Sequence, residues 1–148
     1  YFPSKPEYSL ESGTSVYYSI TENTSIIVQV KYNVIPSNVY MQINQQTQAD
    51  RDYVYDKLLS GVTNGMLSAT GNPAVLKKSF LFCGGVKGMK SSYQCINPRS
   101  GYEEKCFALS LYLVSQNKLC IMMCFLKSNK TNSVKEKDMF YDKLMCYF

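Results

Sequence analysis

The sequence predicts one α+β domain, an α/β/α sandwich with a central, mostly antiparallel sheet of about six strands and helices on both faces. Residues 79–127 have the pattern of three successive strands, and residues 119–126 are apolar on both faces, as in a central strand covered on two sides. Residues 50–70 change to helical spacing instead. A chain of 148 residues with 45% apolar and 18% charged residues can bury one core, so residues 1–148 are expected to form a single domain.

The first third of the chain predicts strands. Two prolines favour an extended backbone over residues 1–12. Apolar residues then alternate over 15–20 and 26–32, and the polar residues between them supply a turn, which predicts a hairpin with one solvated face. The alternation returns at Val39, Met41 and Ile43 and predicts a third strand there.

Residues 50–70 are predicted to form a long helix. Thr47 or Asp50 would accept the first free backbone N–H groups, and Gly71, Asn72 and Pro73 would end the helix. One apolar face is expected, flanked by Tyr55 and Leu59; its members are Val54, Leu58, Val62, Met66 and Ala69.

After this helix the sequence predicts three strands and a closing helix. Gly84, Gly85 and Gly88 interrupt the first strand, which indicates a bulge or a close approach by another backbone. Residues 106–113 and 119–126 form the next two strands. Ser133 with Glu136 has the capping-box pattern of a final helix, giving the order β-β-β-α-β-β-β-α.

This order and several short segments resemble the Mog1/PsbP-like family. The segments are FPSKP near the start, DKLLSGVTNGML in the long helix, LYLVSQNKL between the last strands and FYDKL in the closing helix. The resemblance implies an α/β/α sandwich and mostly non-catalytic roles. PsbP relatives are extrinsic subunits of photosystem II, Mog1 binds the Ran GTPase, and many bacterial relatives are exported. Six cysteines depart from the family pattern and argue against a photosynthetic role.

Composition argues against two functional classes. The net charge is only +5, the lysines are spread along the chain, and Arg51 and Arg99 are the two arginines, so we expect no nucleic-acid partner. The chain has no histidine, the commonest general base and a common zinc ligand. We therefore expect a non-enzyme without catalytic residues, cofactor or metal. The longest apolar stretch is too short for a transmembrane segment.

The cysteines carry the strongest local signal. Cys95 and Cys106 flank residues 96–105 symmetrically, so a hairpin turning at Ser100–Gly101 would place them opposite each other as a candidate disulfide. Cys120 and Cys124 lie at apolar strand positions and are interpreted as buried thiols. Cys83 and Cys146 have no assigned role. The cysteine content and the absence of an initial methionine together predict an exported protein.

Tyrosines and carboxylates supply the remaining candidates. Tyr17, Tyr32, Tyr40 and Tyr53 are candidates for a partner-binding surface, although each also fits a half-buried strand or helix edge. Glu103 and Glu104 are interpreted as solvated carboxylates in a hairpin turn. Asp50, Asp52 and Asp56 are interpreted as carboxylates at the start of a helix, where the helix dipole stabilises negative charge.

The sequence therefore predicts a non-catalytic exported accessory or binding domain that presents a sheet-and-loop surface to a protein or small ligand. One alternative is an intracellular Mog1-like GTPase-associated adaptor, against which an oxidised Cys95–Cys106 pair would count. The other is a small hydrolase or isomerase using carboxylates or a cysteine. Glu103, Glu104 or an aspartate in a deep pocket would favour that enzyme.

Overall fold

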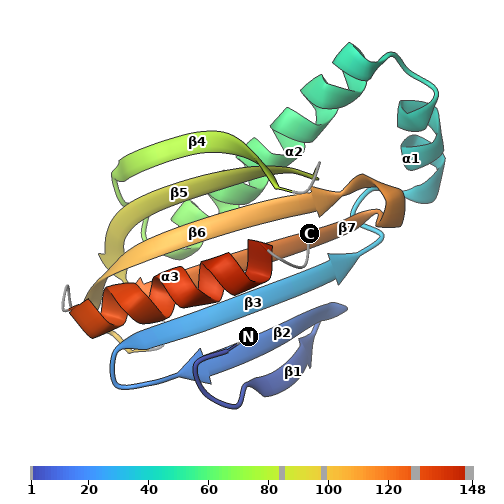
Figure 1. Cartoon of the computed structure of the whole chain (residues 1–148). Coiled ribbons are helices and arrows are strands. Elements are labelled where there is room, and N and C mark those ends of the chain that lie inside the picture. The colour runs from blue at the N-terminus through green and yellow to red at the C-terminus, as the bar shows by residue number, and fades with distance from the viewer. Residues whose placement is uncertain (1, 84–85, 98–99, 128–130, 146–148) are drawn as a thin grey trace.

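Seven strands and three helices make up the fold in the computed structural model, which describes residues 2–83, 86–97, 100–127 and 131–145 (Figure 1). The strands are β1 (Glu7–Glu11), β2 (Thr14–Ile20), β3 (Thr24–Tyr32), β4 (Val75–Cys83), β5 (Val86–Ile96), β6 (Glu103–Leu113) and β7 (Lys118–Leu126). The helices are α1 (Ser37–Asn44), α2 (Gln48–Ala69) and α3 (Thr131–Met145), with a short 3-10 turn, η1 (Val114–Gln116).

All strands belong to one antiparallel sheet in the order β1-β2-β3-β7-β6-β5-β4. β7 is the middle strand and pairs with β3 on one side and β6 on the other. This confirms the prediction that residues 119–126 form a central strand with both faces covered. β1 and β4 are the two edges of the sheet.

Alternate residues of β7 enter two different cores. Cys120, Met122 and Cys124 pack with Phe140 of α3 on one face. Phe125 packs with Met66 of α2 on the opposite face. Strand periodicity thus sorts one apolar run between the two helices, and Figure 1 shows α3 in front of the sheet and α2 behind it.

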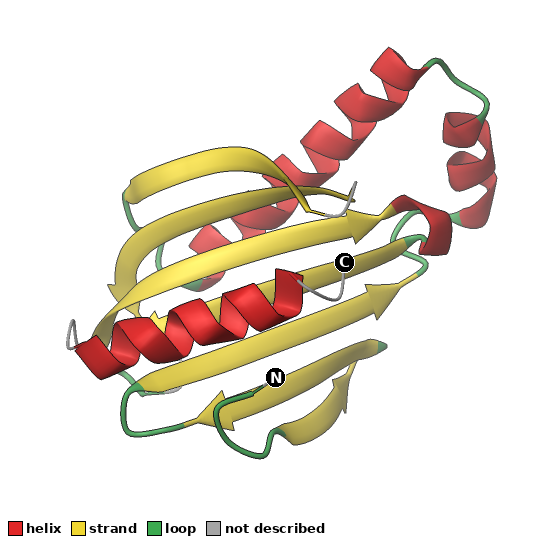
Figure 2. Cartoon of the chain, viewed as in Figure 1, coloured by secondary structure: helices red, strands yellow, loops and turns green. Residues whose placement is uncertain are grey.

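The predicted six-stranded α/β/α sandwich is wrong. The sheet has seven strands, and α3 crosses its face over β3, β7 and β6 without reaching β4 (Figure 2). A helix with its side chains is about 10 Å wide, whereas seven strands spaced by about 4.8 Å span roughly three times that width. One helix on a face therefore cannot form a complete layer.

Two strand predictions are also wrong. Residues 39–43 belong to α1, because alternation over five residues does not exclude a short helix whose Ile43 is buried. The glycine-interrupted strand is two strands, β4 and β5, and its bulge lies at Val75/Lys77 instead. Gly84 and Gly85 lie outside the described residues. Gly88 fits the predicted close approach, since an added Cβ would lie 2.8 Å from the backbone oxygen of Ser110.

The α2 helix begins as predicted but faces the core differently. Thr47 is its N-cap, and the Thr47 hydroxyl accepts a hydrogen bond from the Asp50 backbone N–H at 3.3 Å. Tyr55, Leu59 and Thr63 are buried, whereas Ala69 is exposed. The buried face of α2 is therefore rotated from the predicted one towards Tyr55, Leu59 and Thr63. Thr63 can be buried because its hydroxyl donates a hydrogen bond to the Leu59 backbone oxygen.

Glu136 attaches α3 to the turn between β2 and β3. Its carboxylate accepts hydrogen bonds from Asn23 Nδ2 at 2.7 Å, Thr21 Oγ1 at 2.8 Å and Thr24 Oγ1 at 2.9 Å. Burial acts to raise the pKa of Glu136, but these hydrogen bonds lower it below its usual value. Ser133 lies inside α3 rather than before it, so the predicted capping box is wrong.

Replacing Gly88 tests the tight β5–β6 packing. An alanine Cβ at this position would lie 2.4 Å from Leu111 Cδ2 as well as close to Ser110, so Gly88→Ala should lower the free energy of unfolding by about 1–3 kcal/mol. The matched control is Gly61→Ala in α2, where nothing lies within 4 Å, and this change should raise stability by about 0.5–1 kcal/mol. Urea unfolding would measure the change in the free energy of unfolding for each variant. Equal changes in the two variants would contradict tight packing of Gly88 against β6.

Candidate functional site

The main candidate site is a cleft between α3 and the uncovered part of the sheet. Its volume is about 360 Å³. We call it the α3 cleft, and its principal lining residues are Lys77 and Leu81 of β4, Lys90 and Ser92 of β5, Phe107 and Leu109 of β6, and Lys137, Asp138 and Tyr141 of α3. The cleft lies beside α3, where the helix leaves the neighbouring strands without cover (Figure 2).

The floor of the α3 cleft is apolar. Leu109 is buried in the core that also contains Phe140, and the half-buried Leu81 and Phe107 pack against that core. In β6, odd-numbered residues from Phe107 to Leu113 face α3, while even-numbered residues face α2. The strand alternation that builds the core therefore continues beyond α3 and leaves an apolar surface open to a ligand.

Three lysines surround this floor. Lys77 and Lys90 are exposed and form no ion pair with a residue that the structure describes. Lys137 lies 4.3 Å from the centroid of the Phe107 ring and 2.7 Å from the Asp138 carboxylate. With three ammonium groups and one carboxylate among its lining residues, the α3 cleft carries net positive charge, and such a field favours anions.

Tyr141 has a structural role at the cleft wall. Its hydroxyl donates a hydrogen bond to the Phe107 backbone oxygen at 2.7 Å and thereby ties α3 to β6. Burial raises the pKa of the Tyr141 phenol well above its usual value, so it remains neutral at physiological pH. The arrangement offers an anion an apolar floor, ammonium groups at its border and a fixed aromatic wall.

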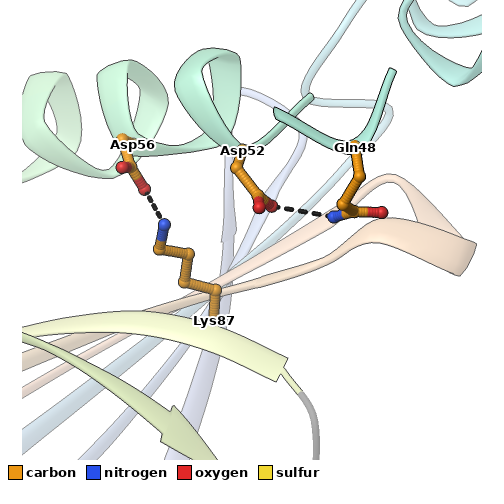
Figure 3. A network of polar contacts seen from close by, with 4 residues as sticks. All are labelled: Gln48, Asp52, Asp56 and Lys87. Carbon is orange, nitrogen blue, oxygen red and sulfur yellow. Dashed lines mark hydrogen bonds and ion pairs between the residues drawn. The ribbon is translucent and has the colours of Figure 1, made fainter. Parts of the chain in front are cut away.

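The carboxylates at the start of α2 are engaged in local contacts. Asp56 forms an ion pair with Lys87, and Gln48 donates to Asp52 at 2.9 Å (Figure 3). Lys87 also lies 5.0 Å from the centroid of Phe80. The Asp56–Lys87 pair joins α2 to the β4–β5 hairpin. The interpretation as helix-start residues fits Asp50, which lies in the first turn of α2, but it is wrong for Asp56, which lies two turns further on.

The carboxylates near the β5–β6 turn do not form an acid–base pair. Glu104 is buried and accepts hydrogen bonds from Asn97 Nδ2 at 2.7 Å and Ser100 Oγ at 2.9 Å, which stabilise the turn. Glu103 is exposed and lines a second, more open cavity. The adjacent residues thus point to opposite sides of the sheet.

Cys95 and Cys106 are neighbours, but they do not face each other. The register pairs Cys95 with Glu104 and Cys106 with Tyr93, because the turn runs from Asn97 to Tyr102 rather than being centred on Ser100–Gly101. Both are free thiols in the structure, as are Cys120 and Cys124. Diagonal neighbours are typically farther apart than disulfide geometry allows, so a bond would require backbone movement, and the disulfide stays a prediction.

The environments of the two thiols differ. Cys95 lines the second cavity, of about 440 Å³, beside Thr70 at the end of α2. The hydrogen bond with Cys106 lowers the pKa of Cys95, although burial and the Glu104 carboxylate act in the opposite direction. Burial raises the pKa of Cys106 well above its usual value. Cys146 and the side chain of Cys83 lie outside the described residues.

The four candidate tyrosines lie on four different elements. Tyr32 and Tyr53 are exposed, with Lys118 and Lys57 respectively over their rings. Tyr17 in β2 packs against Tyr8 at a ring-centroid distance of 5.2 Å, and the Tyr40 hydroxyl donates to the Val114 backbone oxygen. Among the residues that the structure describes, no ring contact or hydrogen bond joins any two of these four tyrosines, and their role in partner binding stays a prediction.

Lys77, Lys90 and Lys137 were not singled out from the sequence. They are separated by 13 and 47 residues along the chain, so no local motif connects them. One feature of the sequence could have indicated a positively charged site: residues 75–96 contain four lysines and no acidic residue. That stretch forms the β4–β5 hairpin at the open side of the cleft.

Comparisons with known proteins define the fold rather than the activity. No protein-family model matches the chain, and no curated protein matches it. It is similar in structure to PA94 from Pseudomonas aeruginosa, a protein of unknown function, with a TM-score of 0.51 and 9% identity over 91% of this chain and 81% of that one. The Mog1/PsbP-like resemblance stays a prediction. In the part of the chain that the structure describes, no helix is long and apolar enough to span a membrane.

The thiol environments predict an order of reactivity. At neutral pH, Cys95 should react with iodoacetamide before Cys120 and Cys124, because burial raises the pKa of Cys120 and, more strongly, that of Cys124, to about 12. Peptide mapping by mass spectrometry would identify the first site. Cys95→Ser should remove the fastest of the labelling phases of these three thiols, and Cys120→Ser is the control. Earlier labelling of Cys124 than of Cys95 would contradict the assignment.

Proposed function

We propose that this chain is a non-catalytic binding domain whose α3 cleft holds a small amphipathic anion. The single observation that supports this proposal is the combination of lysines from three elements around one apolar floor. Binding sites for small molecules are commonly concave and mostly apolar, with a few polar groups that orient the ligand. The volume of about 360 Å³ lies within the range of such sites.

The cleft chemistry favours a ligand with one anionic group and a hydrocarbon or aromatic body. The apolar body would cover Leu81, Phe107 and Leu109, and burial of apolar surface contributes about 25 cal/mol per Å². A carboxylate or sulfonate would lie near Lys77 and Lys90, whose charges no described carboxylate neutralises by an ion pair. The lysine stems allow the ammonium groups to follow ligands of different length.

The proposal keeps the binding role predicted from the sequence and specifies the class of ligand, a small amphipathic anion. Export remains part of it as a prediction, which disulfides in the isolated protein would support. The carboxylate form of the enzyme alternative required carboxylates in a deep pocket. Glu104 instead stabilises a turn, and Asp138 in the cleft is paired with Lys137. These contacts favour binding over acid–base catalysis.

A fluorescent anion tests the proposal. Anilinonaphthalene sulfonate should bind the folded protein with increased fluorescence, and Lys90→Gln should weaken binding by roughly threefold to tenfold, or about 0.7–1.4 kcal/mol. Lys57→Gln is the matched control, since Lys57 lies on α2 over Tyr53 and outside the cleft. Dodecanoate should compete with the dye, whereas dodecanol should compete less.

Circular dichroism and thermal unfolding of each variant would show that the dye reports on folded protein, since loosely packed states also bind it. The proposal would be rejected if both lysine variants bound the dye like the original chain, or if they lost affinity equally. Added salt should weaken binding, because exposed charges at the cleft are screened.

A further inference from the structure

The two edge strands of the sheet carry opposite charge. β1 contains Glu7 and Glu11 and no basic residue, whereas β4 contains Lys77 and Lys78 and no acidic residue. Each edge has outward-facing backbone N–H and C=O groups that no other strand of the described sheet pairs. Charged residues at a single edge prevent sheet-to-sheet pairing, but opposite charges on the two edges attract each other.

Both edges also expose large apolar side chains. The exposed fractions are 58% for Tyr8 and 66% for Leu10 in β1, and 44% for Phe80 and 71% for Phe82 in β4. Tyr8 and Leu10 lie on the face of β1 opposite to Glu7 and Glu11, because side chains alternate along a strand. Phe80 and Phe82 likewise share one face of β4 with Lys78, while Lys77 lies on the other.

We propose that β1 of one copy of this chain adds to β4 of a second copy and extends the sheet. In an antiparallel pair with Glu11 opposite Lys77, Tyr8 lies opposite Phe80 and Leu10 lies opposite Lys78. Facing side chains in such a pair are about 4.5–5.5 Å apart, close enough for ion pairs and aromatic contacts. Glu11 and Lys77 thus join opposite charges on one face of the joined sheet, where Glu7 lies opposite Leu81, and the rings of Tyr8 and Phe80 meet on the other face.

Pairing between like edges is disfavoured by the same charges. Two β4 strands would bring lysines of both copies into one ribbon, and the β4–β5 hairpin contains no acidic residue to offset them. Two β1 strands would bring Glu7 and Glu11 of both copies together. Like charges at facing strand positions are destabilising, so the unlike pair, β1 with β4, is selected.

This contact is heterologous, since it joins two different surfaces of the same chain. Such contacts produce open chains of subunits, or rings where the rotation closes. The added β1 would also lie next to the α3 cleft, because Lys77 and Leu81 of β4 line that cleft. The assembly proposal does not depend on ligand binding, however, and is tested without a ligand.

Sedimentation velocity over a range of protein concentrations tests the assembly. The unaltered chain should form larger species as concentration rises, and added salt should reverse this. Glu7→Lys/Glu11→Lys and Lys77→Glu/Lys78→Glu should each weaken self-association at least about tenfold, because the Glu11–Lys77 pair becomes repulsive and the two edges then carry charge of the same sign. Glu22→Lys and Lys57→Glu, exposed residues outside both edges, are the charge-matched controls.

Mixing the two edge variants separates loss of the interface from loss of folding. Each variant supplies an edge complementary to one edge of the other, so the mixture should associate again, which misfolded chains would not do. The proposal would be overturned by a monomer at all concentrations, by edge variants that associate like the controls, or by a mixture that stays monomeric. A dimer that persists in Glu7→Lys/Glu11→Lys would also overturn it, since β4 would then pair with itself.

Discussion

The burial of β7 on both faces is the constraint on which the rest of the structure depends. Its even-numbered residues and its odd-numbered residues enter separate cores, so neither face of the middle strand can remain open to water. An antiparallel sheet can leave one face solvated, but this sheet cannot. It needs α1 and α2 on one side and α3 on the other, and the three hydrogen bonds of Glu136 hold α3 in place over β3.

The candidate site follows from the width of that sheet. α3 covers the middle strands and no more, while β4 and β5 extend the sheet beyond the helix (Figure 2). Phe107 and Leu109 continue the apolar alternation of β6 into this uncovered region, and Lys137 lies against Phe107 rather than closing the gap. The cleft therefore exists because no helix covers the apolar residues of the sheet beside α3. Its lysines are the basis of the proposed anion binding.

The sequence allowed the middle of the fold to be predicted better than its margins. Residues 119–126 were recognisable as a doubly buried strand because every position is apolar. Thr47, one of the two predicted caps, is the N-cap of α2, because capping is local chemistry. The segment at Val39 was assigned wrongly because a short alternation fits either a strand or a helix. Cys95 and Cys106 were paired on symmetry, but a turn from Asn97 to Tyr102 set another register. The cleft lysines come from three distant segments, and only the tertiary fold brings them together.

Amide chemical-shift mapping of the labelled protein during titration with dodecanoate tests directly whether the α3 cleft binds an amphipathic anion. The account predicts that the largest shifts occur at Ser92, Phe107 and Lys137, which line the α3 cleft. Thr70, Cys95 and Ile96, which line the second cavity beside the end of α2, should change little. Shifts concentrated at those three residues, or no shift at saturating dodecanoate, would contradict the account.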